Sequence, residues 1–217
     1  MVEQGRAFAA TQLVQLFPSC IWQHDLKPED HETIKRRVLP AIGELIARQD
    51  TSDRHLTWQT HHDLHRHEAF EDLIAFARRA ASGVLDHLQV DYAEFQITGC
   101  WANVNPPQSL HRPHSHPNNY LSGVYYVQVP DTADGLVFHD PRAQALVISP
   151  KVKKLSPLTG SEASLEVCEG RLFIFPSWLN HSVAKTRAEG DRISVSFNVM
   201  LSAFAEEFSP PRWSRRR

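Results

Sequence analysis

One stretch, Arg192-Ile-Ser-Val-Ser-Phe-Asn-Val199, alternates strictly between polar and apolar side chains. A period of two is the signature of an extended strand, in which successive side chains point to opposite faces. The polar set is Arg192, Ser194, Ser196 and Asn198. In a solvated sheet such a polar face contacts water, whereas in a closed roll of two sheets it lines a cavity. Because histidines gather elsewhere in this half of the chain, we interpret the polar face as the wall of a cavity.

The rest of the chain after Asp91 consists of short apolar runs separated by Pro, Gly, Asn and Asp. The runs that we expect to be strands are 95–104, 121–129, 136–139, 165–168, 172–175, 182–185 and 193–200. Several short strands at this spacing predict a sandwich or a barrel.

The first half of the chain has a helical pattern of apolar residues. Apolar residues recur at helical spacing between Ile34 and Ile46 and again over 70–88, which predicts two helices. Pro40 interrupts the first pattern, so we expect that helix to kink or to restart near Leu39. The short apolar run at 17–22 predicts an edge strand, and the histidine-rich segment 61–67 predicts a solvated loop or helix start.

Length and composition exclude several classes of protein. The chain has 217 residues, 41% of them hydrophobic, and a formal net charge of -2. This predicts a single domain over 1–217, with a helical support region (1–92), a strand-rich catalytic core (93–201) and a mobile tail (202–217). We expect no nucleic-acid partner, because there is no basic excess, and no membrane span, because no apolar stretch is long enough. Three scattered cysteines and no signal-like N-terminus predict a cytoplasmic protein.

The segment Leu110-His-Arg-Pro-His-Ser-His-Pro-Asn118 holds the first candidate metal ligands. His114 and His116 are two residues apart, so an extended backbone places both imidazoles on one face. Pro113 and Pro117 bracket them and restrict the backbone to extended or turn conformations. Two imidazoles on one face are half of a metal site.

A third imidazole and a candidate anion-binding group follow later in the chain. His181 comes after a buried strand and a turn, and Arg192 begins a further strand eleven residues on. A buried arginine requires an anion, ideally a carboxylate that its two-pronged guanidinium can hold. The hydroxyl groups of Tyr126 and Ser194 could donate to the same anion.

Several ordered motifs in the second half resemble one family. They are Cys100-Trp-Ala-Asn103, His114-Ser-His-Pro117, Leu121-Ser-Gly-Val-Tyr-Tyr-Val127, Phe138-His-Asp-Pro-Arg142, Phe175-Pro-Ser-Trp178 with His181, and Arg192-Ile-Ser-Val-Ser-Phe-Asn198. Together they cover about residues 95–200. On these motifs the chain resembles the iron(II)- and 2-oxoglutarate-dependent oxygenases, and in particular a group of small bacterial and phage members.

The resemblance implies a mainly β fold with flanking helices, namely a double-stranded β-helix (a cupin-like jelly roll) with N-terminal supporting helices. It implies that His114, His116 and His181 bind iron(II), and that 2-oxoglutarate chelates the metal while its far carboxylate pairs with Arg192, Ser194 and Tyr126. The implied activity is a dioxygenase that hydroxylates a substrate and releases succinate and carbon dioxide. The substrate is unidentified and could be a small molecule or a protein side chain.

One position departs from the family pattern. The commonest facial triad has two histidines and one carboxylate, and His116 stands where the carboxylate is expected. His116 could be a third nitrogen ligand, it could leave a two-histidine centre completed by water, or His111 could ligate in a shifted register. Three histidines would also suit a cofactor-independent dioxygenase or a zinc hydrolase. A jelly roll that only binds a ligand is the remaining alternative.

Overall fold

The structure is a computed structural model, and it describes residues 10–48, 57–131, 133–185 and 188–202. The helices are α1 (Pro28–Ala47) and α2 (Glu71–His87), with short 3-10 turns η1 (Leu64–Arg66), η2 (Glu68–Phe70) and η3 (Ala143–Leu146). The strands are β1 (Trp22–Asp25), β2 (Trp58–Gln59), β3 (Phe95–Asn105), β4 (His111–His114), β5 (Leu121–Gln128), β6 (Leu136–His139), β7 (Glu162–Leu165), β8 (Arg171–Pro176), β9 (His181–Val183) and β10 (Arg192–Leu201).

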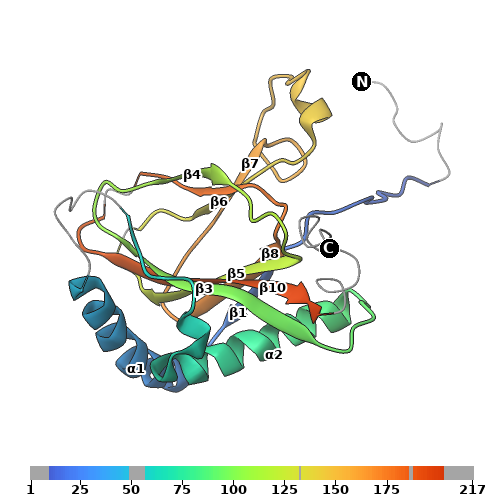
Figure 1. The fold of residues 1–217 in the computed structure, drawn as a ribbon. Helices are drawn as coiled ribbons and strands as arrows, with labels where there is room; N and C mark the ends of the chain where they lie inside the picture. Colours follow the sequence, from blue (N-terminus) through green and yellow to red (C-terminus); the bar gives the residue numbers. More distant parts are fainter. Residues whose placement is uncertain (1–9, 49–56, 132, 186–187, 203–217) are drawn as a thin grey trace, which may run out of the picture.

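These strands form two sheets that face each other. The larger sheet has the order β1-β8-β5-β10-β3-β2 and the smaller one has the order β4-β9-β6-β7. Neighbours in both sheets run antiparallel. Figure 1 shows α1 and α2 along the outer face of the larger sheet, with the smaller sheet on its other side. The predicted jelly roll with supporting helices is therefore confirmed.

The first hydrophobic core lies between the helices and the larger sheet. Ile34, Val38 and Ile42 of α1 are buried there, one helical turn apart. α1 is one helix that continues through Pro40, so of the two expectations, a kink or a restart near Leu39, the restart was wrong. The proline removes one backbone hydrogen bond, and the continuous apolar face on either side of it stabilises the helix as a single unit.

The edge strand begins later than predicted. β1 covers Trp22–Asp25 and pairs with β8, whereas residues 17–21 have no strand conformation and Phe17 is 95% exposed. The pairing is reinforced by Arg171, whose Nε donates to Asp25 Oδ1 at 2.7 Å. A local apolar run cannot specify which residues meet the neighbouring strand, so the sequence placed this strand too early.

The polar face of β10 is buried, as predicted. Arg192 is 2% exposed and Ser194 5% exposed, and both lie in the space between the two sheets. A second, smaller apolar core that includes Phe138 and Phe175 fills part of the same space. The alternation of β10 therefore separates the helix-side core from a polar cavity inside the roll.

The sequence also predicts a mobile C-terminal tail and no membrane-spanning helix. The predicted mobile tail, 202–217, lies outside the described residues apart from Ser202. Among the helices that the structure describes, none is both long enough and apolar enough to cross a bilayer.

Candidate metal centre and anion pocket

A bulge in β4 brings two of its histidines to one face. His114 pairs with His181 of β9, and His111 pairs with Val183. Three residue steps on β4 therefore oppose two steps on β9, so β4 carries one extra residue. In a regular strand, residues three apart point to opposite faces, whereas a bulge restores them to the same face. His111 and His114 consequently both line the cavity between the sheets.

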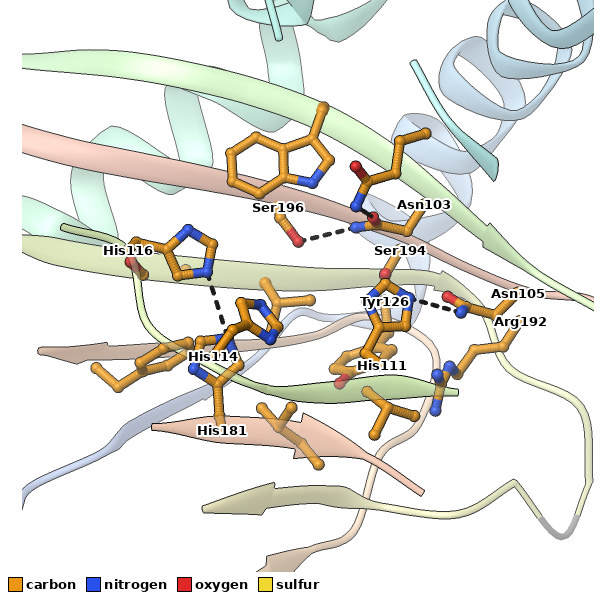
Figure 2. Close-up of a pocket in the computed structure, with 18 residues that line it drawn as sticks. Asn103, Asn105, His111, His114, His116, Tyr126, His181, Arg192, Ser194 and Ser196 are labelled. Carbon is orange, nitrogen blue, oxygen red and sulfur yellow. Dashed lines mark hydrogen bonds between the residues drawn. The ribbon is translucent and has the colours of Figure 1, made fainter. Parts of the chain in front are cut away.

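Three imidazoles converge at one end of this cavity. His114, His116 and His181 each offer a nitrogen, and these atoms all lie within 4.8 Å of one another. The Nε2 atoms of His116 and His181 are 3.3 Å apart. Two nitrogens bound to one metal ion at about 2.1 Å lie roughly 3 Å apart, so the group has the dimensions of a ligand set. Figure 2 shows the rings directed toward a common point.

Backbone carbonyls fix the orientation of two of these rings. The Nδ1–H of His114 donates to Arg112 O at 2.8 Å, and the Nδ1–H of His181 donates to Leu179 O at 3.0 Å. Since a carbonyl can only accept, each ring carries its proton on Nδ1 and presents the lone pair of Nε2 to the cavity. This outer hydrogen bond is the usual way in which a protein orients a histidine ligand.

Burial favours the neutral form of two of these rings, His116 and His181. It lowers the pKa of His181 to about 3 and that of His116 to about 4, and the neighbouring histidines lower both further. Both rings are therefore unprotonated near neutral pH, which is the form that binds a metal.

His116 lies on the loop after β4, where an aromatic stack supports it. Its backbone N–H donates to Ser177 O at 2.8 Å. Its ring stacks on Trp101 with centroids 5.6 Å apart, and Trp101 in turn stacks on His62 at 4.4 Å. The sequence reasoning gave Trp101 no role, although residues 101, 103 and 105 alternate along one strand and so share a face.

Arg192 lies farther along the same cavity and lacks a carboxylate partner. Its guanidinium donates to the backbone oxygen of Asp134 at 3.3 Å, and within the described ranges no carboxylate lies within ion-pair distance of it. Burial lowers its pKa, an effect that the nearby Tyr126 and Asp134 oppose. A buried cation with one long hydrogen bond is a site prepared for an anion.

Tyr126 and Ser194 adjoin this cation. They are paired across β5 and β10, and both line the cavity. Burial raises the pKa of Tyr126 to about 12, so the phenol keeps its proton and can donate a hydrogen bond. The structure thus brings all six sequence-predicted site residues to the wall of one cavity.

The remaining polar wall comes from residues that the sequence did not single out for chemistry. Gln59 Nε2 donates to Asn103 Oδ1 at 2.8 Å, and Asn103 Nδ2 donates to Ser196 Oγ at 3.0 Å. Asn105 Nδ2 faces His111 Nε2 at 2.8 Å. Among the described residues that line the cavity there is no Asp or Glu side chain, so its charged and titratable lining is one arginine, four histidines and a tyrosine.

Fold and site together define a class: a jelly-roll protein in which a cluster of metal-binding residues and an anion-binding arginine share one cavity. A family model described as "putative 2OG-Fe(II) oxygenase" matches residues 99–198, a segment that contains every one of these site residues except Gln59. This segment is similar to the 2OG-Fe(II) oxygenases, a family of oxidoreductases.

Several solved structures share this fold at low sequence identity. A prolyl-4-hydroxylase from Pseudomonas putida has 17% identity and a TM-score of 0.57, over 84% of this chain and 93% of that one. HygX from Streptomyces hygroscopicus, solved with nickel and 2-oxoglutarate, has 13% identity and a TM-score of 0.58, over 85% and 83%. AviO1 from Streptomyces viridochromogenes has 11% identity and a TM-score of 0.60, over 85% and 91%. A search of curated protein sequences finds no match to this chain.

Proposed function

We propose that the protein is an iron(II)- and 2-oxoglutarate-dependent dioxygenase that hydroxylates a C–H bond of its substrate. The observation that carries the proposal is the arrangement inside one cavity: three imidazoles converge at one end, and among the described residues a buried arginine without a carboxylate partner lies along the same wall. A dicarboxylic keto acid requires both features, because it binds a metal at one end and carries a second charge at the other.

Each end of 2-oxoglutarate has its own candidate residues. His114, His116 and His181 would hold iron(II) through nitrogen atoms. Arg192 would hold the far carboxylate with its fork of N–H donors, and the hydroxyl groups of Tyr126 and Ser194 would add two more donors. When bound, iron(II) and 2-oxoglutarate would supply the electrons that activate oxygen, and 2-oxoglutarate would be oxidised to succinate and carbon dioxide.

The chain itself supplies position and environment. The carbonyl partners of His114 and His181 hold the rings in the tautomer that exposes Nε2. Phe138 and Phe175 pack against His181, with ring centroids 6.1 and 4.7 Å away, and keep water from that side of the cluster. Rigid placement of this kind strengthens electrostatic interactions in a site and limits side reactions.

His116 makes this ligand set neutral where the common triad carries a negative charge. Its Nε2 lies 3.3 Å from that of His181, a spacing that favours ligation by His116 over a two-histidine centre. Because three histidines also suit zinc, a zinc hydrolase is the second candidate function. That enzyme would not need Arg192, so the arginine separates the two proposals.

The test is an anaerobic titration of iron(II) into the metal-free protein, with and without 2-oxoglutarate. We expect a weak visible charge-transfer band only when both are present, followed by oxygen-dependent formation of succinate. The band should disappear in His181→Ala and in Arg192→Met. Iron binding without a band would instead support the cofactor-independent dioxygenase, and tight binding of zinc with turnover that is unaffected by Arg192→Met would support the hydrolase.

We also propose that the chain works as one domain, in which residues 1–92 support a catalytic jelly roll over 93–201. Cytoplasmic location is part of this proposal, since Cys20, Cys100 and Cys168 are all free thiols. The substrate is a small molecule or a protein side chain.

A further inference from the structure

His111 is a partly buried polar residue that the proposed mechanism does not use. It lines the same cavity as the metal cluster and Arg192, yet its nitrogens are not part of the three-histidine group. Its ring centroid is 6.4 Å from that of His114, and Figure 2 shows it on the side of the cavity that also carries Arg192 and Tyr126. The sequence alternative in which His111 replaces a ligand is therefore not the arrangement observed.

The backbone directs this side chain inward. Without the bulge in β4, His111 would point away from the face that carries His114. Bulges next to active sites commonly redirect a side chain in this way. Because the register change involves only the step from His111 to His114, its consequence is to add one more imidazole to the cavity wall.

A second buried residue determines which nitrogen of His111 carries the proton. Asn105 is 1% exposed, and one N–H of its Nδ2 donates to Thr57 Oγ1 at 3.0 Å, with Ser109 Oγ farther away at 3.4 Å, which leaves the second N–H for His111. The same Nδ2 lies 2.8 Å from His111 Nε2. With an N–H donor facing it, Nε2 accepts, and the proton of the neutral ring resides on Nδ1.

His111 is thus held as a neutral donor beside a cation that lacks a carboxylate partner. A second cation at this position would be repelled by Arg192, whereas a neutral N–H adds a hydrogen bond without that repulsion. We propose that His111 is a positioning residue for 2-oxoglutarate: it donates its Nδ1–H to the dicarboxylate that Arg192 holds, and Asn105 fixes the tautomer that makes this possible. The proposal rests on the proposed function, because it assigns His111 to the same cosubstrate.

The test measures two dissociation constants under anaerobic conditions, so it does not depend on turnover. One is for iron(II) alone. The other is for 2-oxoglutarate on the iron-loaded protein, followed by the visible band. His111→Phe keeps a ring of similar size and removes the donor. A hydrogen bond to a charged acceptor gives an expected rise of about 10-fold to 100-fold in the 2-oxoglutarate constant, with the iron constant unchanged.

Two further variants separate a hydrogen bond from packing. His111→Gln retains a neutral N–H donor, so it should recover most of the affinity that the Phe variant loses. Asn105→Leu leaves the ring in place but frees its tautomer, and should weaken 2-oxoglutarate binding in the same direction by a smaller factor. If the Phe variant does not fold, His111→Met carries the same comparison against His111→Gln.

Three results would count against the proposal. An unchanged 2-oxoglutarate constant in His111→Phe would overturn it. A parallel rise in the iron constant would identify His111 as a metal ligand instead, and equal loss in the Phe and Gln variants would assign it to packing. Failure of the proposed function has a different signature, since wild-type protein would then give no band with iron(II) and 2-oxoglutarate.

Discussion

Replacing Arg192 with methionine should separate the stability of this protein from its ability to bind 2-oxoglutarate. Arg192 is 2% exposed and makes one long hydrogen bond, of 3.3 Å, to a backbone oxygen. Removing a buried charge that is poorly compensated is often neutral or stabilising when the replacement fills a similar volume. We therefore expect the free energy of unfolding of the metal-free protein to stay the same or to rise by up to about 2 kcal/mol.

The same substitution should weaken the binding of 2-oxoglutarate. Each hydrogen bond from a guanidinium to a carboxylate contributes about 1.5–3 kcal/mol. Two of them give about 3–6 kcal/mol, which corresponds to a loss of roughly 10²-fold to 10⁴-fold in affinity for 2-oxoglutarate.

The assays are urea unfolding of the metal-free protein, followed by tryptophan fluorescence, and anaerobic titration of 2-oxoglutarate into the iron-loaded protein. Arg171→Met is the matched control, because Arg171 pairs with Asp25 far from the cavity lining. It should lower the free energy of unfolding by up to about 1 kcal/mol and leave 2-oxoglutarate binding unchanged. A loss of more than about 1 kcal/mol in Arg192→Met would refute the reasoning, since it would make Arg192 a structural residue.

Three other predictions follow from the same structure. Gly123→Ala would place a Cβ atom against the ring of Phe197. The free energy of unfolding, measured by heat or urea, should therefore fall by about 1–3 kcal/mol. An unchanged unfolding midpoint would mean that the ring moves freely. Burial lowers the pKa of His181 to about 3, whereas the unfolded value is about 6.5. Between these values the unfolded state binds more protons, so the free energy of unfolding of the metal-free protein should fall as the pH falls from 7 to 4. His181→Asn should reduce that slope by up to about 1.4 kcal/mol per pH unit, and equal slopes in the two proteins would contradict the assignment. His116→Ala should weaken iron(II) binding measured by anaerobic titration, whereas His116→Asp should retain it, because a carboxylate is an alternative ligand; equal affinity in wild type and His116→Ala would show that His116 does not ligate.

The parts of the site that sequence predicted well are those set by local spacing. The alternation that begins at Arg192 is a property of any extended strand. His116 lies on the loop just after β4, two residues beyond His114, and its imidazole joins the same cluster. The turn after β8 returned His181 beside His114, as the family motifs implied. The edge strand was misplaced, because its start depends on how Trp22–Asp25 meet β8 and not on its own composition.

Other site residues depend on contacts between distant segments. Trp101 stacks between His62 and His116, and Gln59 of β2 donates to Asn103 of the neighbouring strand β3. The order of residues along the chain does not predict these contacts. The alternation in β3 indicates only that Trp101 and Asn103 share one face of the strand.

The sequence by itself determined that this chain forms a two-sheet roll with a polar interior, and it identified the imidazoles and the arginine inside it. The sheets and their polar interior follow from side-chain periodicity, and the roles of the imidazoles and the arginine follow from the family motifs. Only the tertiary structure decided the role of His111. Its orientation depends on one extra residue in β4 relative to β9. Its tautomer depends on Asn105, which lies on β3 in the opposite, larger sheet. Register and hydrogen-bond partners are fixed when the sheets assemble, so they are absent from any single stretch of the chain.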